Sequence, residues 1–243
     1  MIIFGGVSSD EVRLVVQHWP SRIIPTRKYS TAAVPGRSGD LLDMQDAWEP
    51  YSQSYSVFLR GGRRGDVPAL ARAAAQWLMS KNGYQRLEDS YEPNCYRLAA
   101  YVGPLDIENR LGRYGTATLS FLCGPQRFLL EGENPITLAA SGDTLLNPTV
   151  FPARPLLKIT SSGAGTITVG DITVSIVGTA AFSPLCIDCS TGEAYTVSSG
   201  GVKINRNTYI SGLGLPELPA GETAIRWTGG VSGVEVVPRW WTL

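Results

Sequence analysis

Apolar and polar residues alternate with a period of two along much of this chain, which is the pattern of half-buried β-strands. The pattern is clear at residues 54–60, where Tyr55, Val57 and Leu59 recur at every second position. In the first half, further strands are predicted at 11–17, 22–33, 84–88, 95–102, 105–108, 114–123 and 126–130. Gly124-Pro125 is expected to separate the last two. The first half is therefore predicted to be mainly β.

One segment of the first half has helical spacing instead. The apolar stripe consists of Val67, Leu70, Ala74, Trp77 and Leu78. Asp66 is the expected N-cap, and Pro68 lies in the first turn, where a missing N–H is tolerated. The Asn82-Gly83 pair is a typical helix end. We expect a helix over 67–80 that covers one face or the mouth of a sheet.

A long loop at 34–47 separates the extended run at 22–33 from the strand at 54–60. The loop opens with a Pro-Gly turn and continues with charged residues and a second glycine. Long ordered loops of this kind tend to be functional. The pattern predicts a hairpin arm whose tip reaches a neighbouring molecule. The candidate contact residues are Pro35, Gly36, Arg37, Ser38, Gly39, Asp40, Leu41, Leu42 and Trp48.

Turn-forming residues mark a boundary between two domains. Proline-rich stretches occur at 131–135 and 147–155. We expect a first domain at 1–135, a linker at 136–152 and a second domain at 153–243. Strands are predicted in the second domain at 156–160, 165–169, 172–177, 185–189, 193–197, 223–227 and 231–241, with a hairpin at Gly163-Ala164-Gly165. Short strands at such spacing indicate a β-sandwich or barrel.

The composition and motifs of the sequence do not favour a catalytic function. Lys+Arg and Asp+Glu both number 21, so no net charge attracts nucleic acid, and His18 is the single histidine. No nucleophile motif, phosphate-binding loop or metal-ligand cluster is present in the sequence. Cys186 and Cys189 match C-x-x-C, but in a strand they point to opposite faces and are expected to be separate. We expect no enzyme activity, no catalytic residues, no metal and no cofactor.

No targeting segment is recognised at the start of the chain, and no apolar run reaches 18 residues. We therefore expect synthesis in a cytoplasm, reduced thiols and no insertion into a membrane. Trp227, Trp240 and Trp241 leave one alternative open, because lectins stack sugars on tryptophan. The alternative function is a carbohydrate-binding adhesion module.

Seven segments in a fixed order carry a family resemblance. They are Ser8-Ser9-Asp10, the basic run at 22–28, Val34 to Asp40, Leu87 to Pro93, Tyr96-Arg97, Gly124 to Phe128, and Pro238 to Trp241. Together they resemble the distal tail proteins of long-tailed, non-contractile phages and prophages. The resemblance extends over nearly the whole chain and is densest at residues 8–128.

The resemblance implies a mainly β fold. It implies an N-terminal β-barrel or sandwich-like domain with one α-helix and an extended hairpin arm, followed by a galectin-like C-terminal β-sandwich. Members form a homohexameric ring, through which DNA passes without specific binding, and the arm wraps around the neighbouring subunit. The loop at 34–47 occupies the expected position of that arm.

The resemblance also implies partners and a location. The ring joins the tail tube protein to the tail-tip or tail-associated lysin protein, and it also holds receptor-binding or baseplate proteins. The location is the virion tail, assembled in the cytoplasm of a host bacterium.

Overall fold

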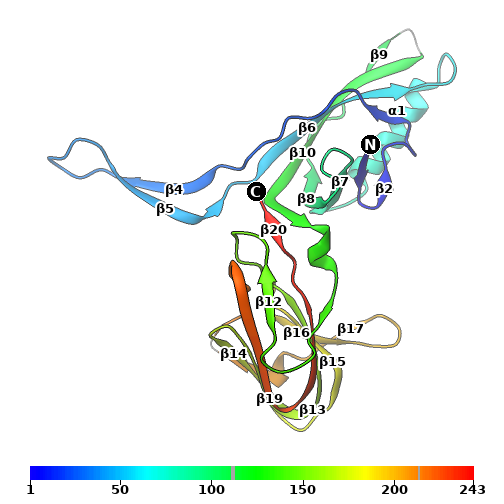
Figure 1. The fold of residues 1–243 in the computed structure, drawn as a ribbon. Coiled ribbons are helices and arrows are strands. Elements are labelled where there is room, and N and C mark those ends of the chain that lie inside the picture. The colour runs from blue at the N-terminus through cyan, green and yellow to red at the C-terminus, as the bar shows by residue number, and fades with distance from the viewer. Residues whose placement is uncertain (111–112, 213) are drawn as a thin grey trace. The chain divides into compact units, whose positions relative to one another are not determined.

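Strands make up most of both halves of the chain in the computed structural model, which describes residues 1–110, 113–212 and 214–243. The predicted mainly β fold is confirmed. The chain divides into two compact units, Met1–Arg127 with Leu243, and Phe128–Thr242 (Figure 1).

The first unit contains one large antiparallel sheet. Its strands are β1 (Ile2–Phe4), β2 (Val7–Ser8), β3 (Leu14–Val16), β6 (Tyr51–Arg60), β7 (Gln85–Asp89), β8 (Cys95–Tyr101), β9 (Glu108–Arg110) and β10 (Tyr114–Leu129). They follow the order β2-β1-β7-β8-β10-β6-β3, and β9 pairs with β10. Tyr55, Val57 and Leu59 of β6 are buried, as the alternation predicts, because successive side chains of a strand face opposite sides.

The helix α1 (Val67–Met79) packs its apolar stripe into the core of the first unit. Ala74, Trp77 and Leu78 are buried there, and the Trp77 Nε1–H donates to the Phe4 carbonyl at 3.0 Å. Asp66 is the N-cap residue, as the sequence predicts. Its backbone is helical, and its carboxylate accepts N–H groups of the preceding loop and not those of the helix.

The strand β10 is longer than the sequence predicts. Pro125 does not end it, and the strand continues to Leu129. The last residue of β10 paired with β6 is Cys123, opposite Tyr51. Because Pro125 lies beyond this pairing, its missing N–H removes no hydrogen bond to β6.

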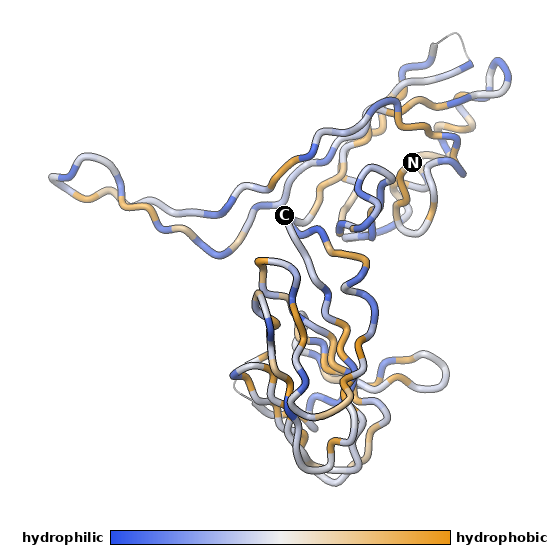
Figure 2. The backbone as a smooth tube through the Cα atoms, viewed as in Figure 1, coloured by the Kyte–Doolittle hydropathy of each residue, from blue (hydrophilic) through white to orange (hydrophobic). Residues whose placement is uncertain are grey.

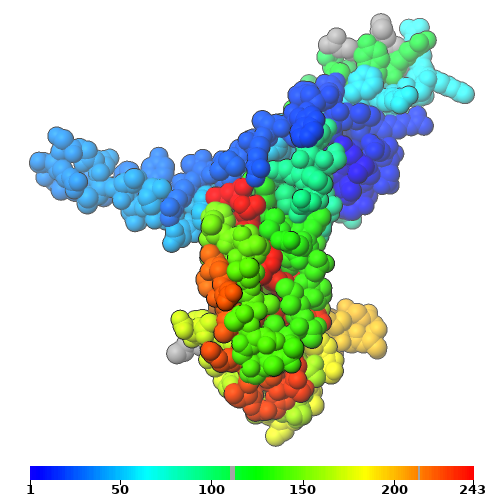
Figure 3. Space-filling view, in the orientation of Figure 1, coloured from blue at the N-terminus to red at the C-terminus, as the bar shows by residue number. Residues whose placement is uncertain are grey.

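The predicted arm is a separate two-stranded sheet made of β4 (Arg27–Ala32) and β5 (Leu41–Trp48). It projects beyond the large sheet of the first unit (Figure 1), and Figure 3 shows its side chains clear of the rest of that unit in this view. The loop expected at 34–47 is shorter, because antiparallel pairing with β4 begins at Leu41.

The second unit contains the second large sheet. Its strands are β11 (Ile136–Thr137), β12 (Thr144–Asn147), β13 (Leu156–Val169), β14 (Ile172–Ile176), β15 (Phe182–Asp188), β16 (Glu193–Val197), β17 (Lys203–Asn205), β18 (Ile210–Gly212) and β19 (Gly221–Val237). The main order is β11-β19-β13-β15-β16-β17. The second unit also contains two short 3-10 helices, η1 (Leu130–Glu133) and η2 (Asn207–Tyr209), and the strand β20 (Trp241–Thr242), which is not part of this second sheet.

Two parts of the second unit differ from expectation. The hairpin predicted at Gly163–Gly165 is wrong: β13 continues through it, with a bulge against β19. Glycines allow this close approach, because a Cβ on Gly165 would lie 2.6 Å from the Thr228 carbonyl oxygen. Residues 136–152, expected as a linker, carry β11 and β12, which both pair with β19.

Candidate subunit-contact arm and its buried anchor

One face of the arm is apolar and exposed. Residues directly opposite each other in an antiparallel pair share a face, and Tyr29 pairs with Met44 while Thr31 pairs with Leu42. The exposed fractions of Tyr29, Leu42 and Met44 are 59%, 61% and 46%. Hydrophobic positions along the hairpin are visible in Figure 2. We call Tyr29, Leu42 and Met44 the apolar arm face.

The opposite face of the arm is more polar. Ser30 pairs with Asp43, and the Ser30 hydroxyl donates to the Asp43 carboxylate at 3.4 Å. A two-stranded hairpin without a partner is marginally stable in water. The arm therefore has the composition of an element that is covered by another surface.

The contact residues predicted from the sequence lie at both ends of the arm. The residues from Pro35 to Asp40 form the exposed connection between β4 and β5, and Leu41 and Leu42 begin β5. Gly36 and Gly39 have φ of +79° and +82°, which explains glycine at both positions. Trp48 ends β5, is half-buried, and lies opposite Arg27.

Sequence reasoning missed two members of the apolar arm face, Tyr29 and Met44. Tyr29 belongs to an extended run that was expected, and Met44 lies in a segment that was expected to be a loop. The signal for Met44 was the alternation of apolar and polar residues with a period of two within residues 41–48, which is typical of a strand. The register of β4 against β5, which brings Tyr29 beside Met44, is set by tertiary pairing.

The root of the arm, defined as residues 17–26, holds no strand although all of it is described. It connects β3 to β4. Side chains of the large sheet hold it in the middle: Gln53 Nε2 donates to the Ser21 carbonyl at 3.1 Å, and Arg127 Nη2 donates to the Ile23 carbonyl at 2.7 Å.

A buried charge network lies behind this root. Arg97 donates to Asp89 at 2.8 Å and also pairs with Glu92, and Arg127 Nε donates to Glu92 at 3.2 Å. The side chains of Arg97 and Arg127 are 5% and 0% exposed. Tyr55 donates its hydroxyl to Asp89 at 2.7 Å. We call Asp89, Glu92, Arg97 and Arg127 the buried anchor.

The buried anchor brings together three of the segments that carry the sequence resemblance. Asp89 and Glu92 come from 87–93, Arg97 follows Tyr96, and Arg127 comes from 124–128. A fourth segment joins from outside, because Arg22 Nε lies 3.3 Å from a Glu92 carboxylate oxygen. Residues far apart in sequence therefore converge on the root of the arm.

Ionisation in the buried anchor follows from burial and pairing. Burial alone would raise the pKa of Asp89, but the hydrogen bond from Tyr55 and the guanidinium of Arg97 outweigh it, so the pKa lies below its usual value. Burial raises the pKa of Tyr51 to about 12 and that of Cys123 to about 11. These groups therefore stay fixed in charge at neutral pH.

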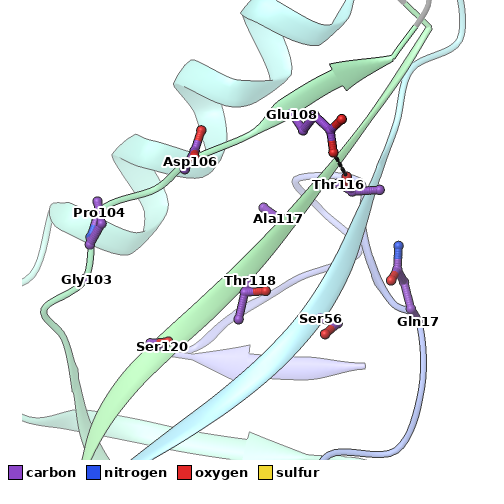
Figure 4. A pocket seen from close by; sticks show the side chains of 10 residues that line it. All are labelled: Gln17, Ser56, Gly103, Pro104, Asp106, Glu108, Thr116, Ala117, Thr118 and Ser120. Atoms are coloured by element: carbon purple, nitrogen blue, oxygen red, sulfur yellow. Dashed lines mark hydrogen bonds between the residues drawn. The ribbon is translucent and has the colours of Figure 1, made fainter.

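A shallow groove on the first unit has a cavity volume of about 460 Å³ (Figure 4). Hydroxyl groups of Ser56, Thr116 and Thr118 line it together with the carboxylates of Asp106 and Glu108. Thr116 Oγ1 donates to Glu108 at 3.4 Å. The lining contains no histidine, cysteine or lysine.

The tryptophans of the sugar-binding alternative offer little stacking surface. Trp240 and Trp241 are 4% and 6% exposed. Trp241 stacks on Phe151 with ring centroids 4.5 Å apart, and its Nε1–H donates to the Pro152 carbonyl. Trp227 is half-buried in β19. Since sugar stacking requires an open ring face, the two buried indoles are unsuited to it.

His18 and the two cysteines of the C-x-x-C motif are the remaining candidates from the sequence. His18 is exposed, and no group of three or more potential metal ligands occurs among the described residues. Cys186 and Cys189 are buried free thiols, and burial raises the pKa of Cys189 to about 12. Within the same described ranges, no helix is long and apolar enough to span a membrane.

A buried ion pair in the second unit makes its stability depend on pH. Arg239 donates Nη1–H and Nη2–H to the two oxygens of Asp188 at 2.7 and 2.9 Å. Burial alone would raise the pKa of Asp188, but the hydrogen bonds from Arg239 and Ser190 dominate and hold the pKa well below its usual value. A depressed pKa in the folded state means that the stabilisation is present above the unfolded pKa, about 3.9.

We expect the melting temperature of the second unit to fall as pH decreases below about 4, towards the folded pKa of Asp188. Asp188→Asn should lower stability at pH 7 and flatten this dependence, because the amide cannot be ionised. Thermal unfolding from pH 7 to pH 2 measures both effects. Asp171→Asn, at an exposed turn between β13 and β14, is the control and should leave the pH dependence intact.

Comparison with known proteins finds no family model that matches this sequence and no match among curated proteins. Solved structures do match. The crystal structure of the Dit protein of phage SPP1, described as a paradigm of the hub adsorption apparatus in phages that infect Gram-positive bacteria, aligns with a TM-score of 0.75. The alignment covers 100% of this chain and 98% of that chain at 14% identity. The chain has the fold of a phage tail hub protein.

Two structures of the phage P2 baseplate in its activated conformation also match this chain. The calcium form aligns with a TM-score of 0.53 and 8% identity, over 92% of this chain and 89% of that chain. The strontium form aligns with a TM-score of 0.55 and 9% identity, over 92% and 90%. The resemblance expected from the sequence is confirmed at the level of the fold.

Proposed function

We propose that this protein is a structural subunit of a phage tail hub. The full-length match to the SPP1 hub protein carries the proposal, because both units and the arm are accounted for by one fold. Among the described residues, no group of three or more potential metal ligands occurs. Fold alone does not establish function, so the exposed apolar arm face is the second support.

The proposed assembly is a homohexameric ring closed by one repeated contact. A contact between two different surfaces of the same chain forms a ring when its rotation closes. The arm supplies one such surface, through Pro35 to Leu42 at its tip, Trp48 at its end and the apolar arm face. The ring would join the tail tube protein to the tail-tip or lysin protein, carry receptor-binding or baseplate proteins, and pass DNA without specific binding.

The ring is tested by the mass in solution, measured by light scattering, with negative-stain imaging of the same peak. Six chains and a central hole are the expected result. If a monomer forms, rings are expected after addition of the tail tube or tail-tip protein. A monomer that also fails to bind these partners would contradict the hub function, and a glycan array would then test the carbohydrate-binding alternative.

Charged residues at the arm tip are expected to contribute to the contact. The double variant Arg37→Ala with Asp40→Ala should shift the population from rings to smaller species, because both side chains are exposed on the isolated chain. Exposed ion pairs typically contribute about 0.2–1 kcal/mol, so a several-fold weaker contact is expected. Light scattering over a dilution series measures it. A hexamer that persists unchanged on dilution would exclude these two residues from the contact.

A further inference from the structure

The root of the arm is held by side chains and not by a strand ladder. Backbone hydrogen bonds fasten its two ends, from Gln17 N to the Ser56 carbonyl at 2.9 Å and from Glu49 N to the Thr26 carbonyl at 2.8 Å. Between these ends, the path of this leg of the arm depends on contacts made by individual residues. The other leg passes directly from β5 to β6 through Glu49 and Pro50.

Arg127 makes the contact best suited to fixing a direction. Its Nη2–H donates to the Ile23 backbone carbonyl at 2.7 Å, while its Nε–H donates to Glu92 at 3.2 Å. The planar guanidinium holds these two bonds in one fixed geometry. Ile23 itself packs against the core of the first unit. The backbone of the root is thereby fixed to β10.

Glu92 extends the same contact to the outer side of the root. It binds Arg127 and Arg97 on its buried side and Arg22 on its exposed side, where the N–O distance is 3.3 Å. The neighbouring aromatic rings of Trp19 and Tyr91 lie 5.0 Å apart. One carboxylate thus connects the root segment to two buried cations.

A gain in folding stability does not by itself explain why these charged side chains are buried. A buried ion pair is often no more stabilising than apolar residues of similar volume, and its best-attested role is to specify one arrangement. Arg127 is completely buried, and its side chain donates to a backbone carbonyl of the root. The charges that flank it come from β7, β8 and the turn between them. This arrangement specifies where the root lies on the sheet.

We propose that Arg127 and Glu92 are positioning residues for the arm: they fix its root so that the tip meets a second copy of this chain at the angle that closes a ring. The proposal rests on the proposed function for its last step. Its first step, the fixed direction of the arm, concerns the isolated chain. An experiment can therefore contradict the fixed direction of the arm or its role in ring closure, one independently of the other.

The direction of the arm is measured by distances between spin labels at Ser38→Cys, in the arm tip, and Gln76→Cys, on α1. A Cys95→Ser background removes the half-buried native thiol, and the other three cysteines are buried. Arg127→Lys is the test variant, because one ammonium group cannot reproduce the fixed fork that joins Glu92 and the Ile23 carbonyl. We expect the width of the distance distribution to increase at least about twofold.

Tyr51→Phe is the matched control. Tyr51 is 7% exposed and adjoins Arg127, and its hydroxyl has no hydrogen-bond partner among the described residues. Its removal should leave the distance distribution unchanged. Unchanged distances in Arg127→Lys would overturn the proposal. Should Arg127→Lys unfold the first unit, Arg22→Gln combined with Trp19→Ala tests the exposed side of the root, and a distribution as narrow as wild type would again overturn it.

Ring formation by the same variants separates the two steps. The expected result is a lower hexamer fraction for Arg127→Lys than for Tyr51→Phe at equal chain concentration. A wild-type fraction of hexamer together with broadened distances would overturn the link between the anchor and ring closure. An absence of rings in every chain, including wild type with its tail partners, would contradict the proposed function and leave the anchoring of the arm supported by the distances.

Discussion

Leu42→Thr combined with Met44→Thr is expected to weaken the contact between subunits by roughly 30-fold. The two side chains are 61% and 46% exposed on the isolated chain, so covering them in an assembly contributes about 1 kcal/mol each. A loss of about 2 kcal/mol corresponds to roughly 30-fold in a dissociation constant. Threonine favours strands, so β5 should remain paired with β4.

The measurement is the hexamer fraction across a dilution series, by light scattering, with thermal unfolding recorded on the same samples. The free energy of unfolding of the first unit should be unchanged, because neither side chain belongs to its core. Val150→Thr provides the matched control: Val150 is 79% exposed in the second unit. Equal effects of the control and of the arm variant on assembly would show that the apolar arm face has no special role.

Arg97→Met is expected to destabilise the first unit by about 3–5 kcal/mol. Arg97 is 5% exposed and pairs with Asp89 and Glu92, whose side chains are 1% and 20% exposed. Removing the cation leaves the Asp89 carboxylate buried without a cationic partner, while Glu92 keeps its ion pairs with Arg127 and Arg22. Asp89 would keep its hydrogen bond from Tyr55, but the pairing that offsets its desolvation would be lost.

Urea unfolding followed by hydrogen exchange of peptides from β8 and β10 measures this loss for the first unit separately from the second. The double variant Arg97→Met, Asp89→Asn removes both charges of the most buried pair, leaves Glu92 paired with Arg127, and should recover part of the stability. Equal stability of the single and double variants would mean that unpaired charge is not the cause. A loss below about 1 kcal/mol for the single variant would contradict the electrostatic account.

The predictions agree best with the structure for elements whose apolar pattern lies within a single segment of the chain. The stripe of α1 and the alternation of β6 were predicted correctly, because each side chain's position relative to the core follows from a local period of 3.6 or 2. The arm was also predicted, since a Pro-Gly turn with a charged loop does not form a core. Its apolar face was not, because that face requires the register of β4 against β5.

Breaks in local pattern were the main source of error. Gly124-Pro125 was expected to end β10, and Gly163–Gly165 to form a hairpin, but both lie inside long strands. The neighbouring strands explain why glycine and proline are tolerated at these sites. The pairing of β10 with β6 stops at Cys123, before Pro125, and β19 approaches closely at Gly165. Such tolerance depends on a partner that is distant in sequence.

The sequence by itself determined the β-rich fold, the helix, the protruding arm and the resemblance to tail hub proteins, because periodicity, turn residues and the order of motifs can all be read along the chain without knowing which segments touch. Only the tertiary structure decided that Asp89, Glu92, Arg97 and Arg127 form one buried network at the root of the arm. In sequence these residues are separated charges of unremarkable spacing. Their pairing depends on which strands become neighbours, and that is fixed when the whole sheet buries its core.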